Sequence, residues 1–338
     1  MTFYIHELGC SKNTTDVEQM TRVLVDAGHL PLSVPQGAEL ILIHTCGFIE
    51  AAVTEGIDAI LEMVDYKEDK CKKIIVSGCL PQRYGKSLAE ELPEVDLFLG
   101  TSYSHRIDEF IDAKTTGIKL GGLDFPLESF KRMEWKNSYA YVKIAEGCDN
   151  YCSYCIIPKL RGPQRSRSID SIVKEVGQLA SLGVKEIILI AQDVSRFGED
   201  RGEIELLPLL RELNEIEGIE WIRLQYIYPD LLTAAFFEEM AKIEKVVPYL
   251  DMPIQHASNK ILKAMNRHTS KEDLIEIVGA AREILPEVSL RTTVMVGFPG
   301  EGEEEFQELL DFVEEIGFDK LGAFVYSDED MAASSKLP

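Results

Sequence analysis

Apolar runs of strand length alternate with amphipathic runs of helix length along almost the whole of this 338-residue chain. Parallel strands buried between helices carry apolar residues on both faces, and these runs have that pattern. The alternation therefore predicts an α/β protein built on parallel sheets. A chain of this length has room for two domains of roughly 150 residues each. This alternation of strand-length and helix-length runs is interrupted once, between residues 115 and 137.

Before the interruption, the pattern predicts a doubly wound parallel-sheet domain over residues 1–114. Residues 115–137 contain Thr-Thr-Gly, Gly-Gly and Pro126, and this turn-rich composition indicates a linker. The expected strands are 3–8, 40–45, 73–78 and 95–100, and the expected helices are 14–27, 49–64, 83–92 and 104–113.

After the linker, six strands alternate with five helices over residues 138–327, which predicts a partial or full (β/α) barrel. Residues 328–338 are expected to form a tail. The expected strands are 140–145, 186–191, 221–226, 247–252, 289–296 and 320–325, and the expected helices are 169–182, 204–216, 231–243, 270–284 and 303–316.

Lysine and arginine number 35 against 58 aspartates and glutamates, which gives a net charge of −23. Proteins that coat nucleic acid need clustered basic residues, so this balance suits small molecules or a basic protein partner better. No apolar run approaches the roughly 18 residues of a membrane helix, and the N-terminus lacks a signal-peptide pattern. We therefore expect a cytoplasmic protein whose seven cysteines stay reduced and serve metal or redox chemistry.

Three cysteines, Cys148, Cys152 and Cys155, follow the first expected barrel strand within eight residues. A short loop can fold around one centre and bring all three thiols to it. Structural zinc is one alternative, but such sites are closed by four ligands, and no fourth cysteine or suitably spaced histidine lies nearby in the sequence. Three thiolates on an iron–sulfur cube leave one iron open for chemistry, so we favour a 4Fe–4S cluster.

Cys10, Cys46 and Cys79 each stand at the end of an expected strand in the first domain. The carboxyl ends of parallel strands meet at one edge of a sheet, where helix N-termini favour anionic thiolates. We expect these three thiols to converge, although each alone could be an ordinary buried cysteine. Cys71 has no such partner and is expected to be structural.

The C-x3-C-x2-C spacing resembles that of the radical S-adenosylmethionine (SAM) superfamily, whose core is a partial (β/α)6 barrel. The resemblance implies that the open iron binds SAM and that Tyr154, just before the last cysteine, lies against the adenine. The stretches 8–13, 45–50 and 78–83 resemble the three N-terminal cysteine motifs of the methylthiotransferases. Those enzymes hold a second 4Fe–4S cluster there, which implies that Cys10, Cys46 and Cys79 bind it.

Further stretches, 155–162, 191–193 and 249–256, resemble the RimO-like branch, which modifies a ribosomal protein. The pair Gln255-His256 is the most distinctive, because the MiaB-like branch, which modifies a tRNA adenosine, usually has Gln-Ser-Gly there. The resemblance implies that sulfur is inserted at, and methylated on, the β-carbon of an aspartate in a small-subunit ribosomal protein, giving 3-methylthioaspartate. A MiaB-like tRNA enzyme and a non-catalytic zinc-bound adaptor are the alternatives.

The resemblance further implies two SAM reactions. One SAM yields methionine and a 5′-deoxyadenosyl radical that takes hydrogen from the substrate carbon, and a second SAM methylates the inserted sulfur. The implied partners are the ribosomal protein and an electron donor such as flavodoxin or ferredoxin, without a membrane and without tRNA. Relatives usually continue into a small C-terminal β-barrel, the TRAM domain, so we interpret a chain ending at Pro338 as a fragment that lacks it.

Polar residues at the ends of the barrel strands are candidates for contacts with SAM, because barrel enzymes place functional groups there. The alternative for each is a strand-end cap, a turn or, for Arg291, a salt bridge. The candidates are Gln192, Asp193, Gln255, His256, Arg291 and Gly297. Arg161, Arg165 and Arg167 crowd the loop after the clustered cysteines, where they could contact an acidic substrate or the SAM carboxylate, or be solvated loop charges.

Overall fold

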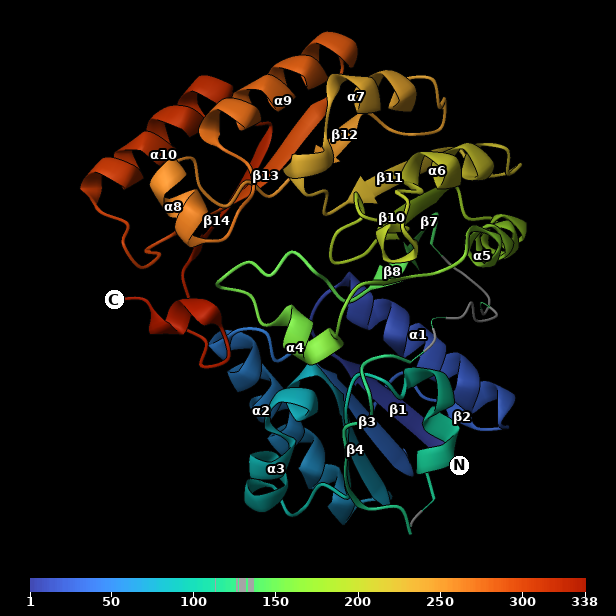
Figure 1. Ribbon diagram of the computed structural model, residues 1–338. Coiled ribbons are helices and arrows are strands. Elements are labelled where there is room, and N and C mark those ends of the chain that lie inside the picture. Colours follow the sequence, from blue (N-terminus) through green and yellow to red (C-terminus); the bar gives the residue numbers. More distant parts are fainter. Residues whose placement is uncertain (113, 126, 128–131, 133–136) are drawn as a thin grey trace. The chain divides into compact units, whose positions relative to one another are not determined.

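The computed structural model describes residues 1–112, 114–125, 127, 132 and 137–338 (Figure 1). The chain forms two compact units. The first consists of Met1–Met133 and Lys159–Pro163, and the second of Glu134–Pro158 and Gln164–Pro338. Within the described ranges, no helix is both long enough and apolar enough to cross a membrane. Both units are α/β, as the alternation predicts.

The first unit is built on a six-stranded parallel sheet in the order β2-β1-β3-β4-β5-β6. The continuous apolar runs of β3 and β4 occupy its centre, and Ile41 pairs with Ile74 there. The strands are β1 (Thr2–Glu7), β2 (Leu30–Pro31), β3 (Leu40–Thr45), β4 (Lys73–Gly78), β5 (Leu97–Leu99) and β6 (Gly117–Lys119), and the helices are α1 (Ser11–Asp26), α2 (Glu50–Val64), η1 (Asp65–Glu68), α3 (Cys79–Glu91) and η2 (Ser104–Phe110).

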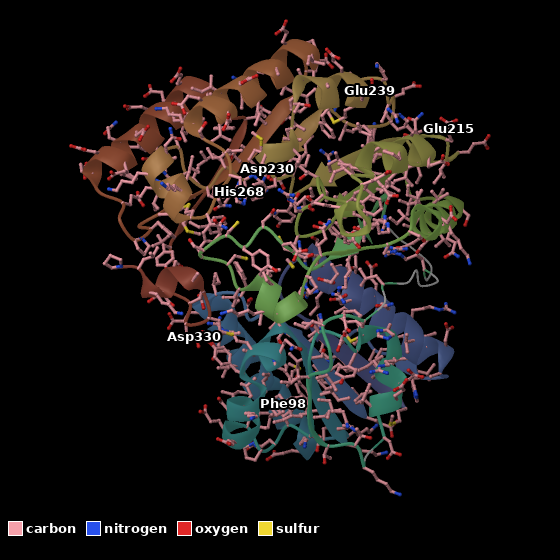
Figure 2. The ribbon with its side chains drawn as sticks, viewed as in Figure 1. Phe98, Glu215, Asp230, Glu239, His268 and Asp330 are labelled. Atoms are coloured by element: carbon pink, nitrogen blue, oxygen red, sulfur yellow. The ribbon has the colours of Figure 1, made fainter. Side chains whose placement is uncertain are left out.

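Helices cover both faces of this sheet, so the predicted doubly wound arrangement is confirmed. One face packs Ile41, Ile43 and Phe98 against α2 and α3, and Phe98, labelled in Figure 2, is 1% exposed. The other face packs Phe3 and Leu42 against α1 and η2.

Two local expectations differ from the structure. β6 lies inside the segment predicted as a linker and adds a sixth strand beside β5. A search for apolar runs misses this strand because it is only three residues long. Pro126 and most of 128–136 lie outside the described residues. The α-helix predicted over 104–113 is instead a 3₁₀ segment, η2, with a non-helical Arg106. Short pieces of helix commonly take this tighter form.

The second unit is a partial barrel of six parallel strands in chain order, in two groups, β7-β10-β11 and β12-β13-β14. One parallel bridge between Ile222 and Val246 joins the groups. The strands are β7 (Tyr139–Lys143), β10 (Glu186–Ile190), β11 (Trp221–Gln225), β12 (Tyr249–Asp251), β13 (Ser289–Val296) and β14 (Lys320–Val325), and the helices that follow the first five are α5 (Ile169–Ser181), α6 (Leu206–Asn214), α7 (Ala234–Met240), α9 (Lys271–Ile284) and α10 (Glu303–Ile316).

Buried apolar side chains from β7, β10, β11, β12, β13 and these helices form one continuous core. Figure 1 shows the helices along one side of the strands. Short elements that lack a long apolar run escaped prediction. They are the antiparallel pair β8 (Ala145–Glu146) and β9 (Arg165–Ser166), α4 (Ile157–Arg161), α8 (Asn259–Ala264) and the 3₁₀ segments η3 (Glu199–Arg201), η4 (Pro229–Leu231) and η5 (Ala333–Lys336).

Candidate cofactor sites

Three cysteines stand at the carboxyl ends of three neighbouring strands of the first sheet. Cys10 follows β1 and is the N-cap of α1, Cys46 directly follows β3, and Cys79 follows β4 as the first residue of α3. The strand order changes direction between β1 and β3, and ligands of doubly wound sheets bind at such switch points. The sheet topology therefore places the predicted cysteines where a ligand site is expected.

The cysteine backbones approach one another closely. A Cβ added to Gly9 would lie 3.0 Å from the Cys46 Cβ, and one added to Gly47 would lie 3.0 Å from the Cys79 carbonyl carbon. The Cys10 and Cys46 thiols both act to raise the pKa of Cys79, so all three thiols interact. We call Cys10, Cys46 and Cys79 the N-terminal triad.

Burial and nearby positive charge shift the pKa values of the thiols in this triad in opposite directions. Burial raises the pKa of the Cys79 thiol to about 11, against the Arg161 guanidinium, which favours its anion. Burial also raises the pKa of Cys10, but Lys12, Arg161 and backbone N–H groups outweigh it and bring this pKa below the ordinary value. The anionic thiolates that metal binding requires therefore have cationic support here.

The second triad, Cys148, Cys152 and Cys155, lies on the loop after β8, and we call it the barrel triad. The pKa values of Cys148 and Cys155 are both raised to about 12, mainly by burial and in smaller part by the Cys152 thiol. In the described residues, no group of three or more His, Cys, Asp or Glu side chains is spaced to hold a single metal ion. In a 4Fe–4S cube each thiolate binds its own iron, so its ligands stand further apart than those of one zinc ion.

Hydrogen bonds fasten the barrel-triad loop to two other segments. Asn150 Nδ2 donates to Asp193 Oδ2 at 2.8 Å, at the end of β10. Ser153 N donates to Met265 O at 2.9 Å, and its Oγ donates to Ala264 O at 2.8 Å. These contacts fix the loop from both sides, so its cysteines are positioned by the barrel framework.

Sequence reasoning missed two residues beside Cys152. Arg267 is buried, its guanidinium lies 3.7 Å from the centre of the Tyr228 ring, and Cys152 helps to raise the pKa of both residues. Burial is the largest influence on each pKa; it raises that of Tyr228 and opposes the rise in that of Arg267. Both residues lie in loops without a motif, so no pattern in the sequence could have found them.

Gln192 and Asp193 both lie at the end of β10 but in different surroundings. Gln192 Nε2 donates to Glu146 Oε1 at 2.7 Å, while its buried Oε1 has no hydrogen-bond partner in the described structure. Asp193 is 2% exposed and accepts from Asn150 and from the backbone N–H of Ser195 at 3.0 Å. Gln192 thus keeps a free acceptor, whereas the Asp193 carboxylate is occupied by the protein.

The remaining cofactor candidates are held as follows. His256 is fully buried, its Nδ1 accepts from Ser258 N at 2.9 Å, and its Nε2 lies 3.8 Å from Glu301 Oε1. Arg291 pairs with Asp251 at 2.6 Å, the salt bridge named as its alternative.

Gln255 and Gly297 are both in the left-handed region, with φ of 70° and 77°. Such a conformation is unusual for a glutamine and is often found at functional sites. Tyr154 packs against Ile261, Met265 and Phe298, next to Cys152 and Cys155.

Of the two alternatives for the loop arginines, that of solvated charges is excluded for Arg161 and Arg167. Arg161 is 3% exposed and pairs with Asp16 at 3.2 Å, and Arg167 is 5% exposed and pairs with Glu175 at 2.7 Å. A buried guanidinium requires such partners. Cys71 is buried in the first core and donates to Lys73 O at 3.3 Å, as expected for a structural cysteine.

A pocket opens in the second unit beside the segments that follow β11 and α8. Asp230 and His268, labelled in Figure 2, contribute to its wall, and Asp273 and Glu276 add further acidic groups. Asp230 pairs with Arg196, and Asp273 accepts from Ser270, so two of its three acidic groups already have partners in the protein.

Residues 142–313 match the radical SAM superfamily, and residues 2–100 match an uncharacterised protein family, UPF0004. Among solved structures, the radical SAM methyltransferase TsrM from Kitasatospora setae is similar in fold, with a TM-score of 0.71 at 13% identity over 98% of this chain and 76% of that one. The cobalamin-dependent SAM radical enzyme OxsB has a TM-score of 0.63 at 14% identity, over 99% of this chain and 54% of that one. The fold and the three-cysteine loop define a radical SAM enzyme, which uses SAM and 4Fe–4S chemistry.

Curated relatives are much closer in sequence. The ribosomal protein uS12 methylthiotransferase RimO of Clostridium novyi is 46% identical over 98% of this chain and 76% of its own length. The protein of the same name from Geobacter sulfurreducens is also 46% identical, over 98% of this chain and 76% of its own. The chain belongs to the RimO family of radical SAM methylthiotransferases.

Proposed function

We propose that this chain inserts sulfur at the β-carbon of an aspartate in ribosomal protein uS12 and methylates that sulfur, giving 3-methylthioaspartate. The observation that carries the proposal is the pair of cysteine triads, one at the carboxyl ends of three parallel strands and one on the loop after β8, in a chain 46% identical to a uS12 methylthiotransferase. A single triad would suffice for SAM cleavage alone. The second one supports sulfur insertion as a separate step.

The two triads would hold two 4Fe–4S clusters, the barrel triad at the SAM site and the N-terminal triad at the sulfur-supplying site. When bound, the first cluster supplies the electron that cleaves SAM, and the second supplies sulfur. The residues of this chain position the reactants. Asp193 holds the barrel-triad loop through Asn150.

Gln192 is the residue best suited to bind the amino group of SAM. Its buried Oε1 has no partner in the described part of the chain, and an ammonium group would satisfy it. Tyr154 lies at the barrel triad, where an adenine ring could stack on it. Gly297, at φ 77°, presents backbone that a nucleoside can approach. The remaining candidates would support the residues that contact SAM without touching it themselves. They are Gln255, His256, Arg291 and Asp193.

The substrate assignment rests on charge as well as on the relatives. A net charge of −23 suits a basic ribosomal protein better than a polyanionic tRNA. We place the reaction in the cytoplasm, where ribosomal proteins are available, and propose a flavodoxin or ferredoxin as electron donor.

Anaerobic reconstitution with SAM, sulfide and a reductant tests this assignment. Given a uS12 peptide and a tRNA in parallel, the enzyme is expected to add one methylthio group to the peptide alone, as measured by mass spectrometry. Modification of the tRNA instead would establish the MiaB-like alternative. Zinc with little iron or acid-labile sulfide in the purified protein would exclude both enzymes and support the adaptor.

Two cysteine variants separate the roles of the triads. Cys152→Ala should abolish formation of 5′-deoxyadenosine, because the SAM site is lost. Cys46→Ala should still cleave SAM but fail to insert sulfur. Normal sulfur insertion by the Cys46 variant would contradict the assigned role of the N-terminal triad.

A further inference from the structure

Arg161 is a buried cation in contact with the N-terminal triad. Its Nε donates to Cys79 Sγ at 3.4 Å, its Nη2 donates to Asn13 Oδ1 at 2.8 Å, and its Nη1 lies 3.2 Å from Asp16 Oδ2. Asn13 and Asp16 both belong to α1, the helix that Cys10 caps. One guanidinium therefore links α1 to the first residue of α3.

The segment that carries Arg161 is held in the first unit by contacts of its own. Thr101 Oγ1 donates to Leu160 O at 3.1 Å. Gly162 has φ of 80°, and a Cβ there would lie 2.8 Å from both Cβ and O of Leu123. The backbone around Arg161 is thus fixed independently of its side chain.

The contact with Cys79 has more than a structural role. Asp16 and Asn13 already satisfy the Nη groups, yet Nε is aimed at a sulfur atom, and a neutral thiol is a weak acceptor. A thiolate accepts a charge-assisted bond much more strongly. The geometry therefore fits Cys79 as an anionic ligand.

The charges around the triad also favour an anionic occupant. Lys12 and Arg161 are both buried and both stabilise the Cys10 anion. Asp16 is the buried acid beside Arg161. Two buried cationic side chains therefore act on the thiols of this triad.

We propose that Arg161 is a positioning residue for the cluster of the N-terminal triad, where its charge orients Cys79 and stabilises the reduced, more negative state of the cluster. This inference rests on the proposed function, since it requires a cluster at these cysteines. Arg161 follows Cys155 by only six residues in the sequence. The polypeptide that carries the barrel triad therefore also supplies a charged group to the other triad.

The test measures a reduction potential rather than turnover. The full chain with Cys148, Cys152 and Cys155 all replaced by alanine would hold only the N-terminal cluster after anaerobic reconstitution. Its midpoint potential is then measured by titration with dithionite, followed by electron paramagnetic resonance. In this background, Arg161→Gln should shift the potential to a more negative value, and Arg161→Lys should shift it less.

A variant expected to shift the midpoint potential in the opposite direction and a matched control complete the design. Asp16→Asn removes the neighbouring negative charge while keeping a hydrogen-bonding side chain, and it should shift the potential to a more positive value. Arg167→Gln removes a guanidinium that is similarly buried but pairs with Glu175 in the second unit, and it should leave the potential unchanged. A purely structural role of Arg161 would not produce shifts of opposite sign.

Each outcome decides a different question. Absence of any iron–sulfur signal in the parent background would refute the second cluster and with it the proposed function. If the cluster forms normally and neither Arg161→Gln nor Asp16→Asn changes its potential from that of the parent background, the role of Arg161 is overturned while the proposed function stands. If Arg161→Gln does not retain iron, Asp16→Asn decides, because an unchanged or more negative potential in that variant contradicts the proposal.

Discussion

Asn150, two residues after Cys148, donates a hydrogen bond to Asp193 at the end of β10, with 2.8 Å between Nδ2 and Oδ2. The same carboxylate accepts from the Ser195 N–H at 3.0 Å and lies 3.4 Å from Arg196 Nε. One buried side chain therefore joins the cysteine loop to the barrel. Its surroundings are those of a support for the cluster loop.

Asp193→Ala should loosen the barrel-triad loop. It leaves the Asn150 amide without its acceptor, at a cost of about 1–3 kcal/mol for a buried polar group. We expect iron to be lost to a chelator roughly tenfold faster or more, measured by absorbance of the iron complex. Asp311→Ala, which removes an exposed carboxylate on α10, is the control. Equal rates of iron loss in the two variants would contradict this role.

Gln192→Ala should weaken SAM binding. A hydrogen bond to a charged group contributes about 1.5–3 kcal/mol, which corresponds to roughly a 10- to 100-fold increase in the dissociation constant. Equilibrium dialysis of labelled SAM with the reconstituted enzyme measures it. Gln178→Ala is the matched control, because Gln178 on α5 also has a buried amide oxygen without a partner among the described residues. An unchanged dissociation constant for Gln192→Ala would remove this residue from the SAM site.

Gly78→Ala should destabilise the first unit. Gly78 has φ of 104°, and a Cβ there would lie 2.5 Å from the Thr45 carbonyl oxygen, so the turn into Cys79 cannot form unstrained. We expect a loss of at least about 2 kcal/mol in the free energy of unfolding, measured with urea by circular dichroism.

Gly177→Ala provides the contrasting substitution. Gly177 lies inside α5, and a Cβ there meets nothing within 4 Å. Alanine is expected to stabilise this helix by roughly 0.5–1 kcal/mol. Similar effects of the two substitutions would show that the turn at Gly78 is not sterically restricted.

His256 should make stability depend on pH. Burial, opposed by the charge of Glu301, lowers its pKa below the ordinary 6.5, so the unfolded chain binds a proton more readily than the folded one. Its contribution to stability is complete above about pH 6.5 and is lost as the pH falls toward the folded-state value. His256→Gln should therefore reduce the fall in unfolding free energy between about pH 7 and 5.5. The exposed His268→Gln is the control, and a slope in His256→Gln equal to that of the parent protein would contradict the prediction.

Long apolar runs made most of the fold predictable. β3, β4, β13 and β14 begin and end at the predicted residues. For β3 and β4 the reason is burial on both faces, because such an apolar run has few alternatives to a central strand. β6 and β8 were missed, because two or three residues carry no periodicity and pair only when a neighbouring strand is in place.

The residues of the candidate site also fall into those that the sequence predicts and those that it does not. The six clustered cysteines could be selected from spacing and strand ends, since both are properties of the sequence and its topology. Arg161 and Arg267 could not be assigned, because the partners of a long side chain depend on where the chain folds back. Arg161 reaches a cysteine 82 residues away.

The sequence by itself determined the two α/β units, the positions of the cysteines and the acidic balance of the chain. The periodicity of apolar residues, the spacing of cysteines and the net charge are all properties of the amino-acid order alone. Only the tertiary structure decided that Asp193 and Arg291 are occupied by protein groups, that Gln192 keeps a free acceptor, and that buried guanidinium groups stand beside Cys79 and Cys152. The physical reason is that burial makes every polar atom require a partner, and partners are chosen by proximity in space.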